Sequence, residues 1–314
     1  MTDSPPDRRV GLVAAWGNYP LVVAKALRRQ NYQVYCLGVM EHADADALAP
    51  LVDDFEWVGL ARLGKAIRYF RRHGVTQATM AGKFHKRILY RPWIWFQHLP
   101  DWTTARWFYP HFVGTKGDRK DDTLLGRLVA GVSVAGITFG PATDYAPELL
   151  VNAAQLTRRE PTPAQRKDVE FGWHNAKEMG RLDIGQSVVV KDRAVIAVEA
   201  IEGTDECIRR AGTLCRGFTL VKVAKPNQDM RFDVPTVGLG TLHRLHEAGG
   251  KVLAIEAEKT IVVDDREEFC RLADQLKIAV VAVREEAGDC FRRPDQAAAQ
   301  PVRLHIPSGG SVNC

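Results

Sequence analysis

The sequence of 314 residues lacks the motifs that would place it in several large functional classes. Its six cysteines form no CxxC pair and have no histidine at zinc-ligand spacing, so we expect reduced thiols and no zinc site. No apolar run reaches the roughly 18 residues that a membrane span needs, and the first residues lack the apolar stretch of a signal peptide. We therefore expect a cytoplasmic protein.

A strong charge of one sign is also missing. The net charge is +5, and lysine and arginine occur in short runs rather than in the dense basic stripe of a nucleic-acid binder. We expect no nucleic-acid partner, whereas an anionic ligand or a lipid surface is compatible with this charge. Hydrophobic residues at 46% and charged residues at 26% are ordinary for a globular protein, and the length suggests two domains at about 150 residues each.

The first half of the chain alternates short apolar runs with amphipathic segments, which is the pattern of parallel βαβ units. After a disordered N-terminus at 1–8, we expect an N-terminal Rossmann-like α/β domain with a parallel sheet at 9–150. Its predicted strands are 10–15, 33–39, 78–81 and 137–139, and its predicted helices are 20–29, 63–73 and 120–135.

Prolines cluster between 140 and 163 and indicate a domain boundary. Beyond it we expect a C-terminal mixed α/β domain at 151–285 and a disordered tail at 286–314. Thr162 is predicted to cap a helix that runs to Gly180, and 191–193 is predicted to be a hairpin turn. The other predicted strands are 186–190, 194–201, 218–223, 252–256, 260–263 and 278–283, and the other predicted helices are 204–214, 238–248 and 266–276.

An aromatic segment at 88–113 combines Trp93, Trp95, Trp102 and Trp107 with basic residues. Two interpretations stay open. One is a pair of helices buried against the sheet. The other is an amphipathic surface for acyl chains or a membrane interface, where tryptophan, tyrosine and arginine combine an apolar body with a polar edge.

Two predicted strand-to-helix turns are candidate ligand sites, because α/β proteins bind phosphate at such places. The stretch VAAWGNYP at 13–20 lacks GxGxxG spacing, which disfavours a dinucleotide; a mononucleotide pocket, a sugar-nucleotide pocket and an ordinary turn stay open. In EAIEGTDE at 199–206, Thr204 is expected to cap a helix, with Asp205 and Glu206 suiting the helix dipole. Glu199 and Glu202 alternatively stand at a strand end where open sheets bind ligands.

The stretch KVAKPNQDMRFDVPTVG at 222–238 concentrates charged residues between prolines. If it is extended, Asp229, Arg231 and Asp233 point to one face, and paired carboxylates there could hold Mg²⁺. Lys222, Lys225 and Arg231 would neutralise phosphate oxygens. The alternative is a salt-bridged surface loop.

This stretch, together with LDIGQSVVVKDRAVIAVEAIEGTDECIRRAG and GLVAAWGNYPLVVAKAL, resembles the LpxI family, the UDP-2,3-diacylglucosamine diphosphatases of lipid A biosynthesis. The resemblance implies a ligand cleft between the two domains and hydrolysis of a pyrophosphate that depends on Mg²⁺ or Mn²⁺. Water attacks the α-phosphorus of the glycolipid nucleotide, giving UMP and 2,3-diacylglucosamine 1-phosphate (lipid X). Peripheral contact with the inner membrane and a homodimer are left open.

The resemblance also implies that Asp229 is essential for turnover, with Asp233 the neighbouring acidic position of the same motif. We expect Asp229, Asp233 and Lys225 to be catalytic, and Asp229, Asp233 and Glu202 to bind the metal. The expected substrate-binding residues are Gly11, Trp16, Gly17, Asn18, Pro20, Gly82, Lys83, Gln186, Gly203, Thr204, Asp205, Lys222, Gln228 and Arg231. A nucleotide-sugar transferase, an oxidoreductase and a non-catalytic nucleotide-sugar or lipid binding protein are the alternatives, although paired carboxylates argue against a binder.

Overall fold

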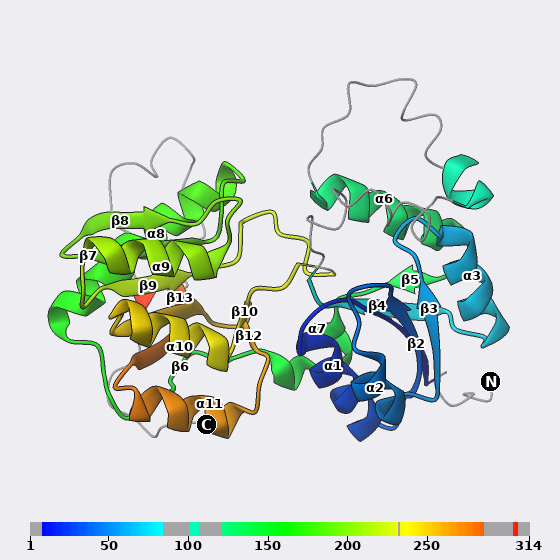
Figure 1. The fold of residues 1–314 in the computed structure, drawn as a ribbon, viewed down its shortest axis with the longest axis horizontal. Coiled ribbons are helices and arrows are strands. Elements are labelled where there is room, and N and C mark those ends of the chain that lie inside the picture. Colours follow the sequence, from blue (N-terminus) through cyan, green and yellow to red (C-terminus); the bar gives the residue numbers. More distant parts are fainter. Residues whose placement is uncertain (1–7, 84–100, 107–120, 232, 286–303, 307–314) are drawn as a thin grey trace. The chain divides into compact units, whose positions relative to one another are not determined.

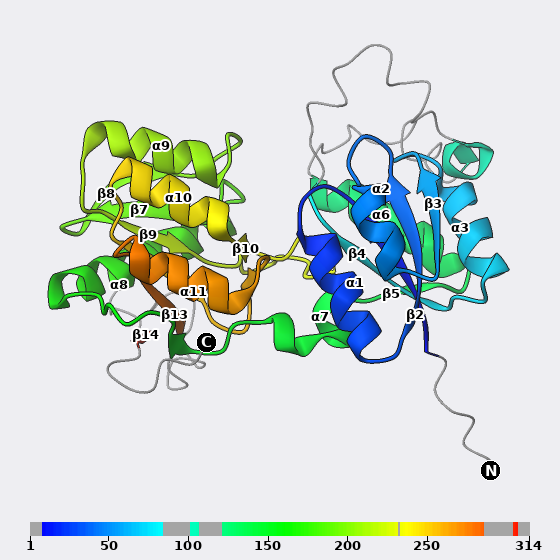
Figure 2. The same cartoon turned by 60° about the horizontal axis from the view of Figure 1, so that its bottom comes forward.

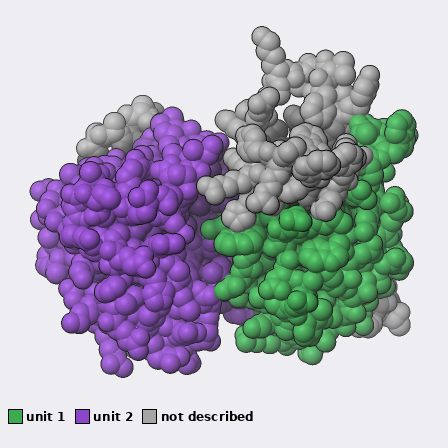
Figure 3. All heavy atoms as spheres, in the orientation of Figure 1, with its two compact units in different colours: residues 1–147, 229–232 green, residues 148–228, 233–314 purple. Residues whose placement is uncertain are grey.

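The computed structural model describes residues 8–83, 101–106, 121–231, 233–285 and 304–306. They form two compact α/β units, one of Met1–Pro147 with Asp229–Phe232 and one of Glu148–Gln228 with Asp233–Cys314 (Figure 3). The predicted fold class, two α/β domains of which the first has a parallel sheet, is confirmed.

The first unit contains a five-stranded sheet in the order β3-β2-β1-β4-β5, in which all neighbouring strands are parallel. This arrangement confirms the predicted Rossmann-like sheet. Strand β3 of this sheet was not predicted from the sequence. It is an edge strand, and two acidic residues interrupt the apolar residues of its sequence DFEWV. The strands are β1 (Arg9–Ala14), β2 (Gln33–Val39), β3 (Asp54–Val58), β4 (Gln77–Ala81) and β5 (Thr138–Phe139).

Helices cover both faces of this sheet (Figures 1 and 2). This is expected, because the strand order reverses between β1 and β4 and parallel crossovers are as a rule right-handed. On the face of α3 and α6, Phe70 is fully buried and lies so close to β1 that a Cβ at Gly11 would stand 2.5 Å from its ring. The helices of this unit are α1 (Tyr19–Arg29), α2 (Ala45–Leu48), α3 (Leu63–Arg72), α6 (Asp121–Val134) and α7 (Ala142–Tyr145), with short 3-10 turns at Ala49–Leu51 and Pro147–Leu149.

The second unit contains a mixed sheet in the order β14-β13-β11-β9-β7-β8, with β6 also paired to β13. Strands β9, β11 and β13 are parallel, while β7 runs antiparallel to β9. The strands are β6 (Ala154–Gln155), β7 (Ser187–Lys191), β8 (Ala194–Val198), β9 (Thr219–Lys222), β11 (Val252–Glu256), β13 (Ala279–Glu285) and β14 (Leu304–His305), and β10 (Thr236–Val237) pairs separately with β12 (Ile261–Val262).

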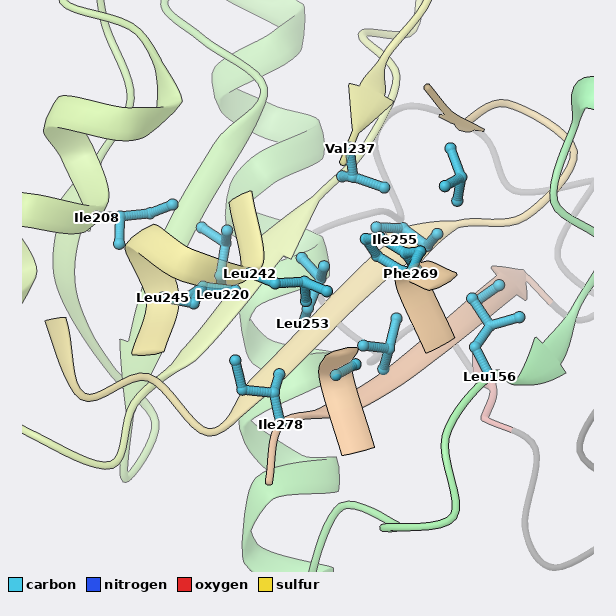
Figure 4. Close-up of a cluster of buried hydrophobic side chains, with 14 of the residues drawn as sticks. Leu156, Ile208, Leu220, Val237, Leu242, Leu245, Leu253, Ile255, Phe269 and Ile278 are labelled. Carbon is cyan, nitrogen blue, oxygen red and sulfur yellow. The ribbon is translucent and has the colours of Figure 1, made fainter. Parts of the chain in front are cut away.

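Two clusters of buried apolar side chains pack the helices of this unit against its sheet. The helices are α8 (Pro163–Arg181), α9 (Thr204–Leu214), α10 (Leu239–Ala248) and α11 (Arg266–Gln275). Because side chains alternate along a strand, Leu220 of β9 faces α9 and α10 while Val221 faces α8 and its buried Trp173. Figure 4 shows the first cluster. It includes Ile208, Leu242, Leu245, Leu253, Ile255 and Phe269.

Two local sequence signals of the second unit are confirmed, the start of α8 and the turn between β7 and β8. Thr162 accepts a hydrogen bond from the Gln165 amide and its own amide donates to the Gln165 side chain, so α8 begins in a capping box. The predicted hairpin turn has positive φ at Asp192 and Arg193, and both amides donate to the carboxylate of Asp168 at 3.2 and 2.7 Å.

Two predictions need correction. The prediction of a disordered tail is wrong for Leu304 and His305, which pair with the end of β13; Leu304 joins the apolar cluster around Trp173. The expectation of reduced cysteines is wrong for Cys270, which is disulfide-bonded, whereas Cys36, Cys207 and Cys215 are free. None of the helices in the described ranges is both long enough and apolar enough to cross a bilayer.

Candidate functional site

Polar side chains collect at one edge of the second sheet, where β9 ends. Because β7 runs opposite to β9, Ser187 at the start of β7 pairs with Lys222 at the end of β9. Glu199 follows β8 at this same edge, since its amide donates to the Ser187 carbonyl at 2.9 Å. This edge is the carboxyl end of the parallel strands, where open α/β sheets bind their ligands.

These residues form a buried hydrogen-bond network. The Thr204 hydroxyl donates to Glu199 Oε1 at 2.8 Å and lies 3.1 Å from Lys222 Nζ and 3.4 Å from Ser187 Oγ. Lys222 is 4% exposed, Glu199 8% and Ser187 0%. The network therefore brings a cation and an anion into the protein interior with a hydroxyl between them.

The predicted capping role of Thr204 is wrong. The N-cap residue of α9 is Gly203, which has a φ of 86° and makes no side-chain capping hydrogen bond. Only glycine adopts this conformation without strain. The Thr204 side chain is therefore turned to the network instead of to the first-turn amides, while Asp205 stays exposed in the first turn of α9.

The chain just beyond β9 is held by an ion pair from the other side of the sheet. Lys177 of α8 donates to both carboxylate oxygens of Glu256 at 2.7 Å, and Glu256 accepts from the Ala224 amide at 2.7 Å. Lys177 also donates to the Ala224 carbonyl at 3.1 Å. Sequence reasoning missed both residues, because no local motif links positions that are 79 apart in the chain.

Two predicted residues, Lys225 and Gln228, continue this anchored stretch. Gln228 accepts from the Lys225 amide at 2.7 Å and donates to Gln186 Oε1 at 3.2 Å. Lys225 Nζ forms an ion pair with Asp183 at 2.8 Å. The structure thus brings the predicted residues Gln186, Lys225 and Gln228 together at the edge that carries Lys222.

Asp229 and Arg231 form an ion pair with each other. The prediction that Asp229, Arg231 and Asp233 point to one face of an extended segment is wrong. Arg231 Nε lies 2.9 and 3.0 Å from the two carboxylate oxygens of Asp229. The backbone turns at Met230 and Arg231, so the extended geometry required for that face is absent. The hydrogen-bonded guanidinium holds the pKa of Asp229 below its usual range, and the carboxylate raises the pKa of Arg231.

The proposed metal ligands do not come together in the residues that the structure describes. Within those ranges, no group of three or more histidine, cysteine, aspartate and glutamate side chains is arranged to hold an ion. Glu202 pairs with Arg210 at 2.8 Å, and both Asp229 oxygens already accept from Arg231. The residues therefore do not fit a metal site as they stand, and the ligand set Asp229, Asp233 and Glu202 stays a prediction.

The first unit has a second candidate edge, at the point where its strand order reverses between β1 and β4. The loops after these strands pair there: the Trp16 and Lys83 backbones exchange hydrogen bonds of 3.2 and 2.9 Å. Gly82 has a φ of 104°, and a Cβ on it would stand 2.7 Å from the Ala15 carbonyl carbon. Glycine is therefore required for this close approach.

The structure brings most of the predicted residues of this edge together. Trp16, Gly17 and Asn18 lead into α1, which begins at Tyr19 and has Pro20 in its first turn. Trp16 is 49% exposed, and Asn18 makes no side-chain capping bond. Gly11 is different, because it lies within β1 against Phe70 and its small size is explained by packing.

The aromatic segment is described only at 101–106, where Trp102 is 81% exposed. Asp101 and Thr104 accept from the first amides of α3, at 3.0 Å from Lys65 and 2.9 Å from Leu63. Trp93, Trp95 and Trp107 lie outside the described residues. Both interpretations of the segment therefore stay predictions.

These features define a protein with two α/β domains, each with polar or loop residues gathered at the carboxyl edge of its sheet. Residues 9–149 match the family model described as the LpxI N-terminal domain, and residues 152–281 match the LpxI C-terminal domain. The chain belongs to the LpxI family, which confirms the resemblance found in its motifs. A relative from Caulobacter vibrioides, named UDP-2,3-diacylglucosamine pyrophosphatase LpxI, is 30% identical over 287 residues, covering 88% of this chain and 98% of the relative.

Proposed function

We propose that the protein hydrolyses the pyrophosphate bond of UDP-2,3-diacylglucosamine, releasing UMP and lipid X in lipid A biosynthesis. One observation carries this proposal: the chain matches a relative with that named activity over 98% of the relative's length, and so over both domains. The buried polar edge of the second sheet supports it, because Lys222 and its neighbours supply the charge that a diphosphate requires.

Lys222, Lys225 and Arg231 are proposed to bind the phosphate oxygens and to stabilise the charge that develops on them during hydrolysis. In the free protein Arg231 is engaged by Asp229. A substrate phosphate competes for the same guanidinium fork, because carboxylate and phosphate present similar paired oxygens. Binding of substrate then releases Asp229 from the contact that lowers its pKa.

This exchange gives Asp229 a role that fits its electrostatics. A carboxylate whose pKa is lowered is a weak base, so Asp229 paired with Arg231 is poorly suited to accept a proton. Once Arg231 turns to phosphate, Asp229 becomes a stronger base and is able to orient the attacking water. Asp233 is proposed as the second acidic residue of this reaction.

A requirement for Mg²⁺ or Mn²⁺ is a separate part of the proposal. Such an ion would polarise the phosphate and lower the pKa of a bound water. Since the described residues do not present a complete ligand set, the requirement rests on the family and on the acidic residues of the motif. Peripheral contact with the inner membrane is also proposed, because the substrate carries acyl chains, and a homodimer stays open.

The decisive experiment incubates the purified full chain with UDP-2,3-diacylglucosamine and measures UMP, with Mg²⁺, with Mn²⁺ and with EDTA. We expect UMP in the first two conditions and a loss with EDTA. Asp229→Asn should lower kcat at least a hundredfold, whereas the matched variant Asp46→Asn, at an exposed position of α2, should keep wild-type kcat. Absence of UMP from the wild type under every metal condition would refute the proposal and favour a non-catalytic binding protein.

A further inference from the structure

We propose that Glu199 is a positioning residue for the reaction, acting through the Thr204 hydroxyl on the Lys222 ammonium. Lys222 is the group that contacts the substrate phosphate. The inference rests on the proposed function for the identity of that substrate. It adds a residue that neither the motif nor the family match assigns.

The direction of the hydrogen bonds supports this order. A lysine ammonium only donates, a carboxylate only accepts, and a threonine hydroxyl has a single hydrogen. Thr204 must therefore donate to Glu199 at 2.8 Å and accept from Lys222 at 3.1 Å. Glu199 thus fixes the rotation of the hydroxyl, and the hydroxyl in turn fixes the end of the Lys222 side chain.

Stability alone does not account for this arrangement. Glu199 is 92% buried, and among the described residues its Oε2 has no hydrogen-bond partner. A buried unsatisfied carboxylate oxygen is costly, and an apolar side chain of similar size would avoid that cost. Lys177 and Glu256 offer a contrast, because they pair directly at 2.7 Å and both oxygens of that glutamate accept hydrogen bonds.

The position of the network also points to an anion. The Lys222 ammonium lies beside the first residue of α9, an 11-residue helix whose amino end carries positive partial charge. Lys225, which is also proposed to bind phosphate, lies three residues further along the chain in the same unit. Glu199 lies behind Thr204 and is linked to the Lys222 ammonium through the Thr204 hydroxyl.

The test compares hydroxyl removal with hydroxyl retention at one position. Thr204→Val should lower kcat and kcat/KM for UMP release by at least about tenfold, because an interaction made in the transition state loses its geometry. Thr204→Ser keeps the hydroxyl and should stay within about threefold of the wild type. Thr219→Val in β9 is the matched control, since Thr219 is fully buried and its hydroxyl has no partner in the described structure.

A double-variant cycle separates positioning from simple stabilisation. In a Lys222→Met background, Thr204→Val should cause no further loss of kcat, because its effect passes through the ammonium. Independent, multiplicative losses would overturn the inference, as would wild-type kcat in Thr204→Val. If Thr204→Val does not fold, as judged by circular dichroism and thermal unfolding, Glu199→Met in both backgrounds provides the same cycle, because methionine removes the oxygen that accepts from Thr204.

The outcomes distinguish this inference from the proposed function. If the wild type releases UMP and the Thr204 variants match it, only the inference fails. If the wild type releases no UMP, the proposed function fails and the inference fails with it.

Discussion

Replacing Lys177 by methionine tests the ion pair that holds the chain beyond β9. Lys177 Nζ lies 2.7 Å from both oxygens of Glu256 and 3.1 Å from the Ala224 carbonyl. Methionine keeps an unbranched apolar body of similar length over Trp173, whose ring centroid lies 5.1 Å from the ammonium, but removes the charge. Glu256 is then left with the Ala224 amide as its remaining contact from this network.

Removing one partner of a buried ion pair costs about 3–5 kcal/mol, mainly because the other charge stays buried. The Lys177 side chain is 22% exposed and that of Glu256 12%, so water compensates in part. We expect the free energy of unfolding to fall by about 2–4 kcal/mol, measured by urea denaturation. Lys177→Met/Glu256→Gln should recover part of this loss, because it leaves no buried charge.

The matched control for this prediction lies in the first unit. Lys65 and Glu56 form an ion pair of 2.9 Å with 30% and 34% of their side chains exposed. Lys65→Met removes this pair and a 2.6 Å hydrogen bond to the Trp57 carbonyl, and should cost only about 0–1 kcal/mol because water reaches both side chains. If Lys177→Met costs no more than Lys65→Met, the argument that the pair anchors the chain beyond β9 is refuted.

Three further predictions concern the pH dependence of activity, the pH dependence of stability, and membrane contact. Arg231→Gln should raise the pKa of Asp229 by removing the hydrogen bonds that lower it, and so move the acid limb of the kcat/KM profile to higher pH. An unshifted limb would contradict the pairing. The same pair contributes less than about 1 kcal/mol to the free energy of unfolding. This contribution is fully present above the pKa that Asp229 has in the unfolded chain, and it is lost as the pH falls through the lower pKa of Asp229 in the folded protein. The double variant Leu182→Ser/Ile201→Ser should weaken flotation with anionic phospholipid vesicles, because these side chains are 60% and 91% exposed in loops next to the polar edge. The control variant Leu214→Ser should float like the wild type, since Leu214 is 65% exposed but lies at the end of α9. Equal flotation of all variants would argue against membrane contact at these loops.

Most helices and strands were predictable because their signals are local. The capping box at Thr162 depends on residues three apart, and the hairpin at 191–193 on a short polar interruption between two β-rich runs. Strand β3 was missed because its acids break the apolar pattern at the sheet edge. Strand β14 was missed because its partner β13 lies across a long stretch without periodicity.

The candidate site was less predictable, because its contacts join distant parts of the chain. The sequence indicated Lys222 and Thr204 separately, but the usual role of threonine before an acidic helix start suggested a cap. Gly203 takes that position in the structure, which frees the Thr204 hydroxyl for Glu199 and Lys222. A glycine directly before the threonine was the available signal, since a positive φ there moves the helix start by one residue.

Two lysines lie near the end of β9, and their contacts differ in a way that suits one to stability and the other to chemistry. Lys177 comes from α8 on one side of the sheet and is neutralised directly by Glu256, which fixes Ala224. Lys222 belongs to the strand itself and is linked to Glu199 through the Thr204 hydroxyl. Lys177 donates to both oxygens of Glu256 and to the Ala224 carbonyl, so its three donors are engaged within the protein, whereas the hydroxyl at Lys222 takes one donor and adds no negative charge. The first arrangement therefore suits an anchor, and the second suits a residue that acts on the substrate.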